Sequence, residues 1–209
     1  GRSGCGKTTL LRILAGLESL DGGEILFEKQ EKLGVVFQEP RLMPWLTLEQ
    51  NILFGADKKK YSKNQLKERE EGLLKLTGLE KFGNAYPDQL SGGMMQRAAL
   101  GRALACDASY LLMDEAFAAL DQFTRQTMQK EFLRICEEEK VGALFVTHSV
   151  DEALLLGNEI LVMENGKVGS RFDVGEKVTY PRDLLSEEMI EIKRKILITL
   201  ENKSEIQNL

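Results

Sequence analysis

The feature that most constrains the fold of this 209-residue chain is the glycine-rich run at its start, GRSGCGKTTLLRILAGL. Its spacing, Gly1-x-x-x-x-Gly6-Lys7-Thr8, is typical of a loop that holds phosphate groups. Glycine lets the backbone curl so that successive N–H groups face phosphate oxygens, and a helix beginning near Lys7 adds the positive end of its dipole. The sequence therefore predicts a nucleotide site that leads directly into a helix.

We expect the whole loop and the first turn of the helix to bind the phosphates, through Gly1, Ser3, Gly4, Cys5, Gly6, Lys7, Thr8 and Thr9. Lys7 would bridge the β- and γ-phosphates, and the Thr8 hydroxyl would ligate Mg²⁺. A loop of this kind needs a β-strand in front of it, and the given sequence has none. This favours the hypothesis that the chain is truncated relative to a functional protein, with the alternative that it cannot bind nucleotide as it stands.

Downstream of the loop, short apolar runs alternate with patterns of helical spacing. Strands are predicted at residues 22–27, 33–38, 110–115 and 142–148, followed by a hairpin at 159–169 whose turn is Asn165-Gly166. Helices are predicted at residues 8–17, 92–105, 121–139, 149–157 and 184–202, with Asp121 and Ser149 as N-caps of two of them. This alternation predicts an α/β fold with a mostly parallel sheet and helices on both faces.

The stretch between residues 40 and 90 is different in character, because it is rich in charge and broken by glycine and proline. It predicts a subdomain of short helices inserted into the α/β core. We therefore expect a core of residues 1–39 and 91–170, a helical insert of residues 40–90, and a C-terminal tail of residues 171–209 that carries an amphipathic helix.

Polar side chains end three of the predicted strands. Asp114 and Glu115 end YLLMDE, His148 ends GALFVTH, and Gln38 ends LGVVFQ. Ligands of open α/β sheets bind at this edge, so Asp114 would hold Mg²⁺ and Glu115 would orient or deprotonate a water. Gln38 could reach the metal or the water, and His148 a γ-phosphate. The alternative for Asp114 and Glu115 is an ordinary strand that ends in acidic loop residues. The alternative for His148 is a structural histidine.

A second glycine-rich helix start lies at LSGGMMQ, where Ser91, Gly92 and Gly93 form another anion-binding terminus. One nucleotide occupies one phosphate loop, so a second such terminus in the same chain needs a different role. In a head-to-tail pair of chains, each LSGG run would close on the nucleotide held by the partner's loop. The sequence therefore predicts a dimer.

Composition and charge limit the remaining classes. The formal net charge is −5, which disfavours a nucleic-acid surface as the main binding site. The three cysteines are scattered without metal-ligand spacing, so we expect reduced thiols. We also expect no signal peptide and no membrane span, so that any association with a membrane depends on a partner.

Five motifs in fixed order, GRSGCGKTT, VVFQEP, LSGGMMQR, LLMDEAFAALD and FVTHSVDEA, run from Gly1 to about Gly166. With these motifs the chain resembles the ATPases of the ABC (ATP-binding cassette) family. The resemblance implies a P-loop NTPase fold and a homodimer that holds two ATP molecules with Mg²⁺. It implies that Lys7, Thr8 and Asp114 bind the phosphates and the metal. It further implies that Glu115 is the catalytic base and that His148 stabilises the γ-phosphate. At the dimer seam it implies a role for Ser91, Gly92, Gly93 and Asp121.

The run QEPRLMPWLTLEQNILFG and the C-terminal YPRDLL tail resemble importers of nitrate, aliphatic sulfonates, taurine and related solutes. The resemblance implies a cytoplasmic subunit on the inner face of the membrane, a permease docked near Glu39–Trp45, and a solute-binding protein reached through the permease. A plain packing role is the alternative for Trp45. A soluble, non-transport ABC ATPase is a further alternative, disfavoured by the short insert between Gln38 and Leu90.

Overall fold

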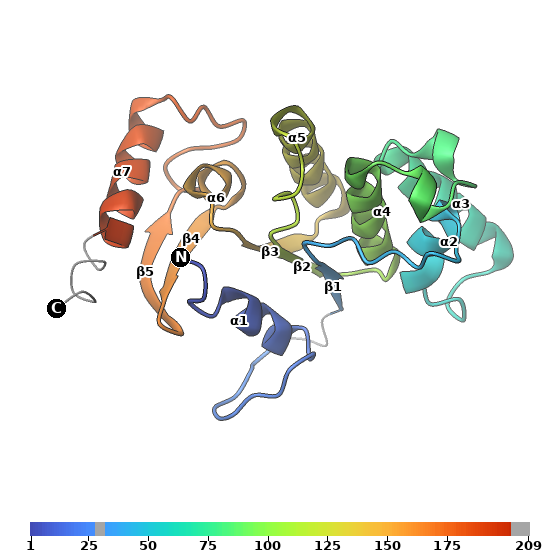
Figure 1. Ribbon diagram of the computed structural model, residues 1–209, viewed down its shortest axis with the longest axis horizontal. Coiled ribbons are helices and arrows are strands. Elements are labelled where there is room, and N and C mark those ends of the chain that lie inside the picture. Colours follow the sequence, from blue (N-terminus) through green and yellow to red (C-terminus); the bar gives the residue numbers. More distant parts are fainter. Residues whose placement is uncertain (28–31, 202–209) are drawn as a thin grey trace. The chain divides into compact units, whose positions relative to one another are not determined.

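The structure is a computed structural model that describes residues 1–27 and 32–201 (Figure 1). The chain forms two compact units. We call residues 20–144 the central unit, and residues 1–19 together with the chain from residue 145 onward the terminal unit. The predicted division into core, insert and tail stays a prediction.

A three-stranded sheet of β1 (Leu33–Val36), β2 (Tyr110–Asp114) and β3 (Gly142–Val146) has the order β1-β2-β3. Strands β1 and β2 are parallel, as predicted. β2 is the more deeply buried of the two, because every residue from Leu111 to Asp114 is buried. Together with the helices that follow each strand, this confirms an α/β fold with a parallel sheet.

Two long helices, α4 (Gly92–Ala105) and α5 (Gln122–Glu139), lie on the same side of β1 and β2 (Figure 1). α4 is buried around most of its circumference, so it packs against the sheet on one side and the helical insert on the other. Two glycines allow the close approach. A Cβ built on Gly34 of β1 would lie 2.8 Å from the Ala103 carbonyl oxygen, and one on Gly55 would lie 2.6 Å from the Arg102 carbonyl oxygen.

The helical insert consists of α2 (Leu48–Ile52), α3 (Lys63–Leu76) and the 3₁₀ turns η1 (Leu53–Gly55), η2 (Glu80–Phe82) and η3 (Pro87–Gln89). Capping boxes start both α-helices. Thr47 with Gln50 caps α2, and Ser62 with Gln65 caps α3. These caps satisfy backbone N–H groups that have no partner inside the helix, and they therefore stabilise the start of both helices in the predicted insert.

An ion cluster ties α3 to the end of α4. The Asp107 carboxylate lies 2.6 Å from the Lys60 ammonium, the Arg69 guanidinium and the Tyr61 hydroxyl. Burial on its own would raise the pKa of Asp107, but hydrogen bonds from Lys60 and Tyr61 and the charge of Arg69 hold it below its ordinary value. Arg69 also donates to the Leu104 carbonyl, so the cluster covers the C-terminal end of α4.

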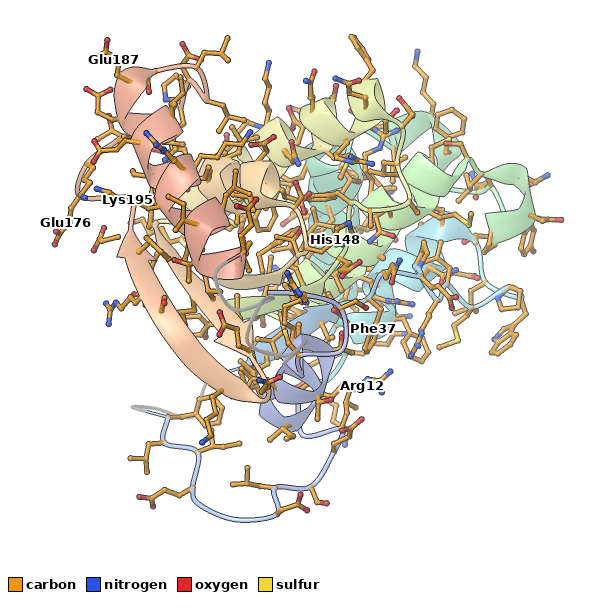
Figure 2. All side chains as sticks on the ribbon, turned by 60° about the vertical axis from the view of Figure 1, so that its left-hand side comes forward. Arg12, Phe37, His148, Glu176, Glu187 and Lys195 are labelled. Atoms are coloured by element: carbon orange, nitrogen blue, oxygen red, sulfur yellow. The ribbon has the colours of Figure 1, made fainter. Side chains whose placement is uncertain are left out.

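The terminal unit contains α1 (Lys7–Leu14), α6 (Val150–Leu156), the antiparallel strands β4 (Glu159–Glu164) and β5 (Lys167–Asp173), and α7 (Glu187–Glu201). Helix α7 begins at Glu187 and carries Lys195 in its later half (Figure 2). One apolar cluster joins α6, the hairpin and α7, and it consists of Leu154, Ile160, Val162, Val174, Met189, Ile192 and Ile196.

Buried Arg182 closes the end of α6. It donates to the carbonyl oxygens of Leu154 at 2.8 Å and Gly157 at 2.7 Å, and its guanidinium stacks on the Tyr180 ring. A guanidinium has five donors in one plane, so a single side chain can satisfy several carbonyls left open at a helix end. This explains the Pro-Arg of the C-terminal tail as a structural feature.

Most predicted elements are present, and one is wrong. Asn165 and Gly166 adopt left-handed φ values of 46° and 75°, which confirms the predicted hairpin turn. Residues 22–27 form no strand, because they pair with no strand among the described residues and leave Leu26 80% exposed. The last residue of the predicted C-terminal helix, 202, lies outside the described residues.

The close approach of Gly55 to α4 leads to a first prediction. We expect Gly55→Ala to lower the free energy of unfolding by roughly 1–3 kcal/mol, because the new methyl group collides with the Arg102 carbonyl. Urea unfolding followed by circular dichroism measures the change.

Gly72→Ala is the matched control, because Gly72 lies inside α3 with no atom within 4 Å of the added Cβ. There we expect a gain of roughly 0.5–1 kcal/mol from helix propensity. Equal effects of the two substitutions would show that contact with α4 is not what requires glycine at position 55.

Candidate functional site

The phosphate loop in the terminal unit has the backbone that its glycines predict. Gly4 and Gly6 adopt left-handed φ values of 77° and 98°, and α1 begins at the next residue, Lys7. Gly6 is the N-cap of α1, and no side chain caps this helix end. The start of α1 therefore presents N–H groups without a side-chain cap to the concave side of the loop, as an anion site requires.

Lys7 curls back over the loop. Its ammonium donates to the carbonyl oxygens of Gly1 at 2.9 Å and Arg2 at 2.8 Å, and it lies 3.7 Å from the Cys5 sulfur. A polyphosphate would offer the same ammonium charged oxygens in place of neutral carbonyls, which makes stronger hydrogen bonds. A Cβ built on Gly4 meets no atom within 4 Å, so the loop also leaves space for such a group. The residues present fit a nucleotide phosphate.

The β4–β5 hairpin supports this loop. The sequence did not predict this contact. The Gly166 N–H donates to the Cys5 carbonyl at 3.1 Å. Gly1 approaches β4 so closely that a Cβ there would lie 2.2 Å from the Met163 carbonyl oxygen. The signal in the sequence was the Asn-Gly turn, but it predicts only a hairpin and not what the hairpin contacts.

In the central unit, the end of β2 carries the two predicted carboxylates. Asp114 is the last residue of the strand and is 9% exposed. Glu115 follows in a left-handed conformation with φ of 46°, which an L-residue with a long side chain rarely adopts. Strained backbone of this kind is concentrated at functional sites, where it directs a side chain that a relaxed turn would aim elsewhere.

Arg125 holds the loop after Glu115 in place. Its guanidinium donates to the carbonyl oxygens of Phe117 at 3.1 Å and Leu120 at 2.7 Å. Asp121 then starts α5 by accepting hydrogen bonds from the backbone N–H groups of Phe123 and Thr124. A hydrogen bond from the Thr124 side chain, followed by these backbone hydrogen bonds, lowers the pKa of Asp121. Asp121 is therefore an N-cap, as predicted, while its place at a dimer seam stays a prediction.

The segment around Gln38 is fastened to α4. The buried Gln96 side chain donates to the Phe37 carbonyl at 3.1 Å, and Arg102 donates to the carbonyls of Arg41 at 2.7 Å and Pro40 at 2.8 Å. Burial lowers the pKa of Arg102. The helix that begins at the LSGG run thus holds both ends of the turn that contains Gln38.

The LSGG run itself is open to solvent. Ser91 and Gly92 are exposed, and the Ser91 hydroxyl accepts a hydrogen bond from the Met94 N–H at 3.3 Å as the N-cap of α4. A Cβ on Gly93 would lie 3.0 Å from the Thr124 methyl group, so α4 and α5 meet closely here. This geometry leaves Ser91 and its neighbours accessible to a second molecule.

His148 lies in the terminal unit, just beyond β3 (Figure 2). It is exposed, and the following Ser149 caps α6 by accepting from the Glu152 N–H at 3.2 Å. The structure therefore brings together the phosphate-loop residues in one unit, and the Gln38 and LSGG segments in the other. The catalytic and ligand roles of all these residues stay predictions.

Comparisons with known proteins identify the family of the chain. A model of the ABC transporter family matches residues 1–118. The chain is 46% identical to the aliphatic sulfonates import ATP-binding protein SsuB of Bacillus cereus, over 99% of this chain and 84% of that one. An uncharacterised ABC transporter ATP-binding protein of Methanocaldococcus jannaschii is also 46% identical, over 97% of this chain and 78% of that one.

Among solved structures, a dimeric ATP-binding cassette in a post-hydrolysis state, bound to ADP and phosphate, has a TM-score of 0.73 at 30% identity. The match covers 83% of each chain. The chain therefore belongs to the ABC transporter family, and it is an ATP hydrolase of the kind that is coupled to transport. Within the described residues, no helix has the length and apolarity needed to cross a bilayer.

Arg125 gives a test that separates positioning from binding. We expect Arg125→Met to lower kcat for ATP hydrolysis roughly tenfold with little change in KM, because the loop after Glu115 loses its fixed shape. Steady-state ATPase assays measure both constants. Lys130→Met, an exposed position on the same helix, is the control and should leave both unchanged. A roughly tenfold rise in KM would assign Arg125 to nucleotide binding instead.

Proposed function

We propose that this chain powers the import of a small solute, nitrate, a sulfonate, taurine or a related compound, through a partner membrane permease. The observation that carries the proposal is the 46% identity to a sulfonate import protein over 99% of this chain. A nitrate import protein, NrtC of Synechococcus elongatus, is 41% identical over 91% of this chain. Because the sulfonate match spans more of both proteins, an aliphatic sulfonate is the favoured solute.

The phosphate loop would hold ATP. The backbone N–H groups of Gly4, Gly6 and neighbouring loop residues would surround the phosphates, and the Lys7 ammonium would leave the carbonyls of Gly1 and Arg2 to bridge the β- and γ-phosphates. Thr8 and Asp114 would hold Mg²⁺, with Gln38 as a further ligand. When bound, Mg²⁺ would neutralise charge on the phosphate oxygens.

Glu115 would act as the general base on the attacking water. Its left-handed backbone and the fixed loop behind it restrict where the carboxylate can point, and a base must be within hydrogen-bond reach of its water. His148 would donate to the γ-phosphate. Ser91, Gly92 and Gly93 would contact the nucleotide of a second copy of the chain, with Asp121 at the seam between copies.

The permease would dock beside the Gln38 turn, in the region Glu39–Trp45. Trp45 is 70% exposed, which argues against a packing role and for contact with a partner. Buried Asn51 fixes the loop that carries it, by bonding to the backbone of Met43 and to the carbonyl of Leu46. A solute-binding protein would act through the permease, and the subunit would work on the inner face of the membrane.

The proposed base can be tested directly. We expect Glu115→Gln to lower ATP turnover at least a hundredfold while ATP binding is kept, because the amide cannot accept the proton. Size-exclusion chromatography with ATP should then show a stable dimer. Glu187→Gln, an exposed change at the start of α7, should behave as wild type. Undiminished turnover in Glu115→Gln would remove Glu115 from this role.

The transported class needs a separate test. In proteoliposomes that contain this chain with its permease and solute-binding protein, we expect an aliphatic sulfonate to raise ATP turnover severalfold, because loading of the transporter is coupled to hydrolysis. Glucose is the control and should have no effect. Stimulation by nitrate alone would correct the solute, and stimulation by glucose alone would contradict the proposed class.

A further inference from the structure

A pocket of about 490 Å³ lies between three helices of the central unit. Its lining comes from the end of α3 and from parts of α4 and α5. Leu100, Met128 and Ile135 contribute buried apolar surface, and Phe123, which also lines the pocket, is 81% exposed. Concave sites of this size with mostly apolar walls are where proteins bind small molecules. The pocket can therefore receive the apolar body of a ligand.

Three charged residues line the pocket: Lys75, Arg97 and Glu131. The Glu131 carboxylate is already paired, because it accepts hydrogen bonds from Arg134 Nε at 3.1 Å and Arg134 Nη2 at 2.8 Å. Arg134 also pairs with Glu138, which is outside the lining. Among the residues that the structure describes, the Lys75 side chain takes part in no ion pair or hydrogen bond. The lining therefore has positive charge in excess.

Arg97 is fastened through only one of its nitrogens. Its Nη1 donates to the carbonyl oxygens of Thr77 at 2.9 Å and Gly78 at 3.3 Å. Gly78 has a left-handed φ of 64°, and a Cβ there would lie 3.1 Å from Nη1, so glycine admits the guanidinium. Within the described residues, Nε and Nη2 of Arg97 donate to no acceptor. Burial lowers the pKa of Arg97 against the opposing charge of Glu131, so this cation is partly desolvated and has donors to spare.

The other polar groups of the lining are already engaged. The last carbonyl groups of α3 and of the turn after it accept hydrogen bonds from Arg97 and Arg134. Each hydroxyl of the lining takes part in a hydrogen bond within its own helix or helix cap: Thr77, Ser91, Thr124 and Thr127. The pocket thus offers few acceptors to a cationic ligand, while its two cations still have unused donors. This difference favours an anionic ligand.

We propose that the pocket binds a small molecule with an apolar body and one carboxylate or sulfonate group, which Arg97 and Lys75 hold. Nε and Nη2 lie on one edge of a guanidinium, so Arg97 can donate to two oxygens of the anionic group at once, and the Lys75 ammonium adds a second charge. The apolar body would lie against Phe123 and Met128. Because part of the LSGG run lines the pocket, the molecule would also contact that run. The site is separate from the phosphate loop, which belongs to the terminal unit.

Three probes with the same phenylbutyl body test the charge preference: phenylbutyrate, phenylbutanol and phenylbutylamine. Met94 and Met128 both line the pocket, so the NMR signals of isotope-labelled methionine methyl groups report binding directly. We expect phenylbutyrate to bind the full chain about tenfold more tightly than phenylbutanol, and phenylbutylamine to bind most weakly. The preference should shrink at high salt, because salt screens the two cations. The signal of Met163, in the terminal unit, should not move.

Matched variants locate the preference. Arg97→Gln should bind phenylbutyrate and phenylbutanol equally. Because Arg97 also fastens the end of α3, a second variant, Lys75→Gln, removes a charge without breaking a described bond, and it should lower the preference about two- to threefold. Lys130→Gln, an exposed change on α5 outside the lining, removes the same charge and should keep the full preference. Phe123→Ala should weaken all three probes to a similar extent, because it removes apolar surface.

Four results would overturn the inference. Equal binding of the three probes to the wild-type chain would show an apolar pocket without an anion site. An unchanged preference in Lys75→Gln would assign the charge effect to another part of the surface. Displacement of phenylbutyrate by ADP would place the probe at the phosphate loop, and methyl signals that stay fixed at millimolar probe would show that the pocket binds none of the three. The probes need neither a permease nor a transported solute, so none of these results decides the import proposal.

Discussion

The central unit depends on how closely other elements approach helix α4. The backbone of β1 at Gly34 and of η1 at Gly55 lies close to carbonyl oxygens of α4. At both positions the space is too small for any residue larger than glycine. Because α4 contacts strand β1, the insert and the start of α5, the same helix sets the position of each of these parts. The LSGG run at its start and the Gln38 turn along its side are consequently both attached to the same helix.

Irregular segments of the chain are held by cations that bind backbone carbonyls. Arg102 does so for the turn after Gln38, Arg125 for the loop after Glu115, and Arg182 for the end of α6. Loops leave carbonyl groups without partners, and a buried carbonyl without a partner is costly. One guanidinium donates to several such carbonyl groups at once, and its positive charge strengthens each hydrogen bond. An arginine can therefore order a loop that contains no strand or helix. Lys7 makes similar bonds in the phosphate loop, but with a flexible ammonium that a ligand can recruit.

The sequence predicted the regular elements well because their signals are local. Caps such as Asp121 and Ser149, the apolar run of β2 and the Asn165-Gly166 turn all lie within a few residues of the structure they produce. The strand predicted at residues 22–27 failed because a strand requires a partner, and no pattern within six residues shows whether one is available. The positioning roles of Gln96, Arg102 and Arg125 were equally hidden, since each contacts a backbone group that carries no side-chain signature. Motif residues could be named from the sequence because their proposed chemistry depends on the type of side chain and on its spacing along the chain.

The support of the phosphate loop by the β4–β5 hairpin bears on how the protein is made. Cys5 and Gly166, which share a backbone hydrogen bond, are about 160 residues apart, so this contact is among the most non-local in the chain. During synthesis the loop leaves the ribosome long before the hairpin that supports it. A growing chain therefore carries the glycine-rich loop for most of its translation without the hairpin contact that holds it, and the loop gains this support only when the hairpin has been made. The contact thus delays completion of the phosphate loop until more than three quarters of this sequence has been translated.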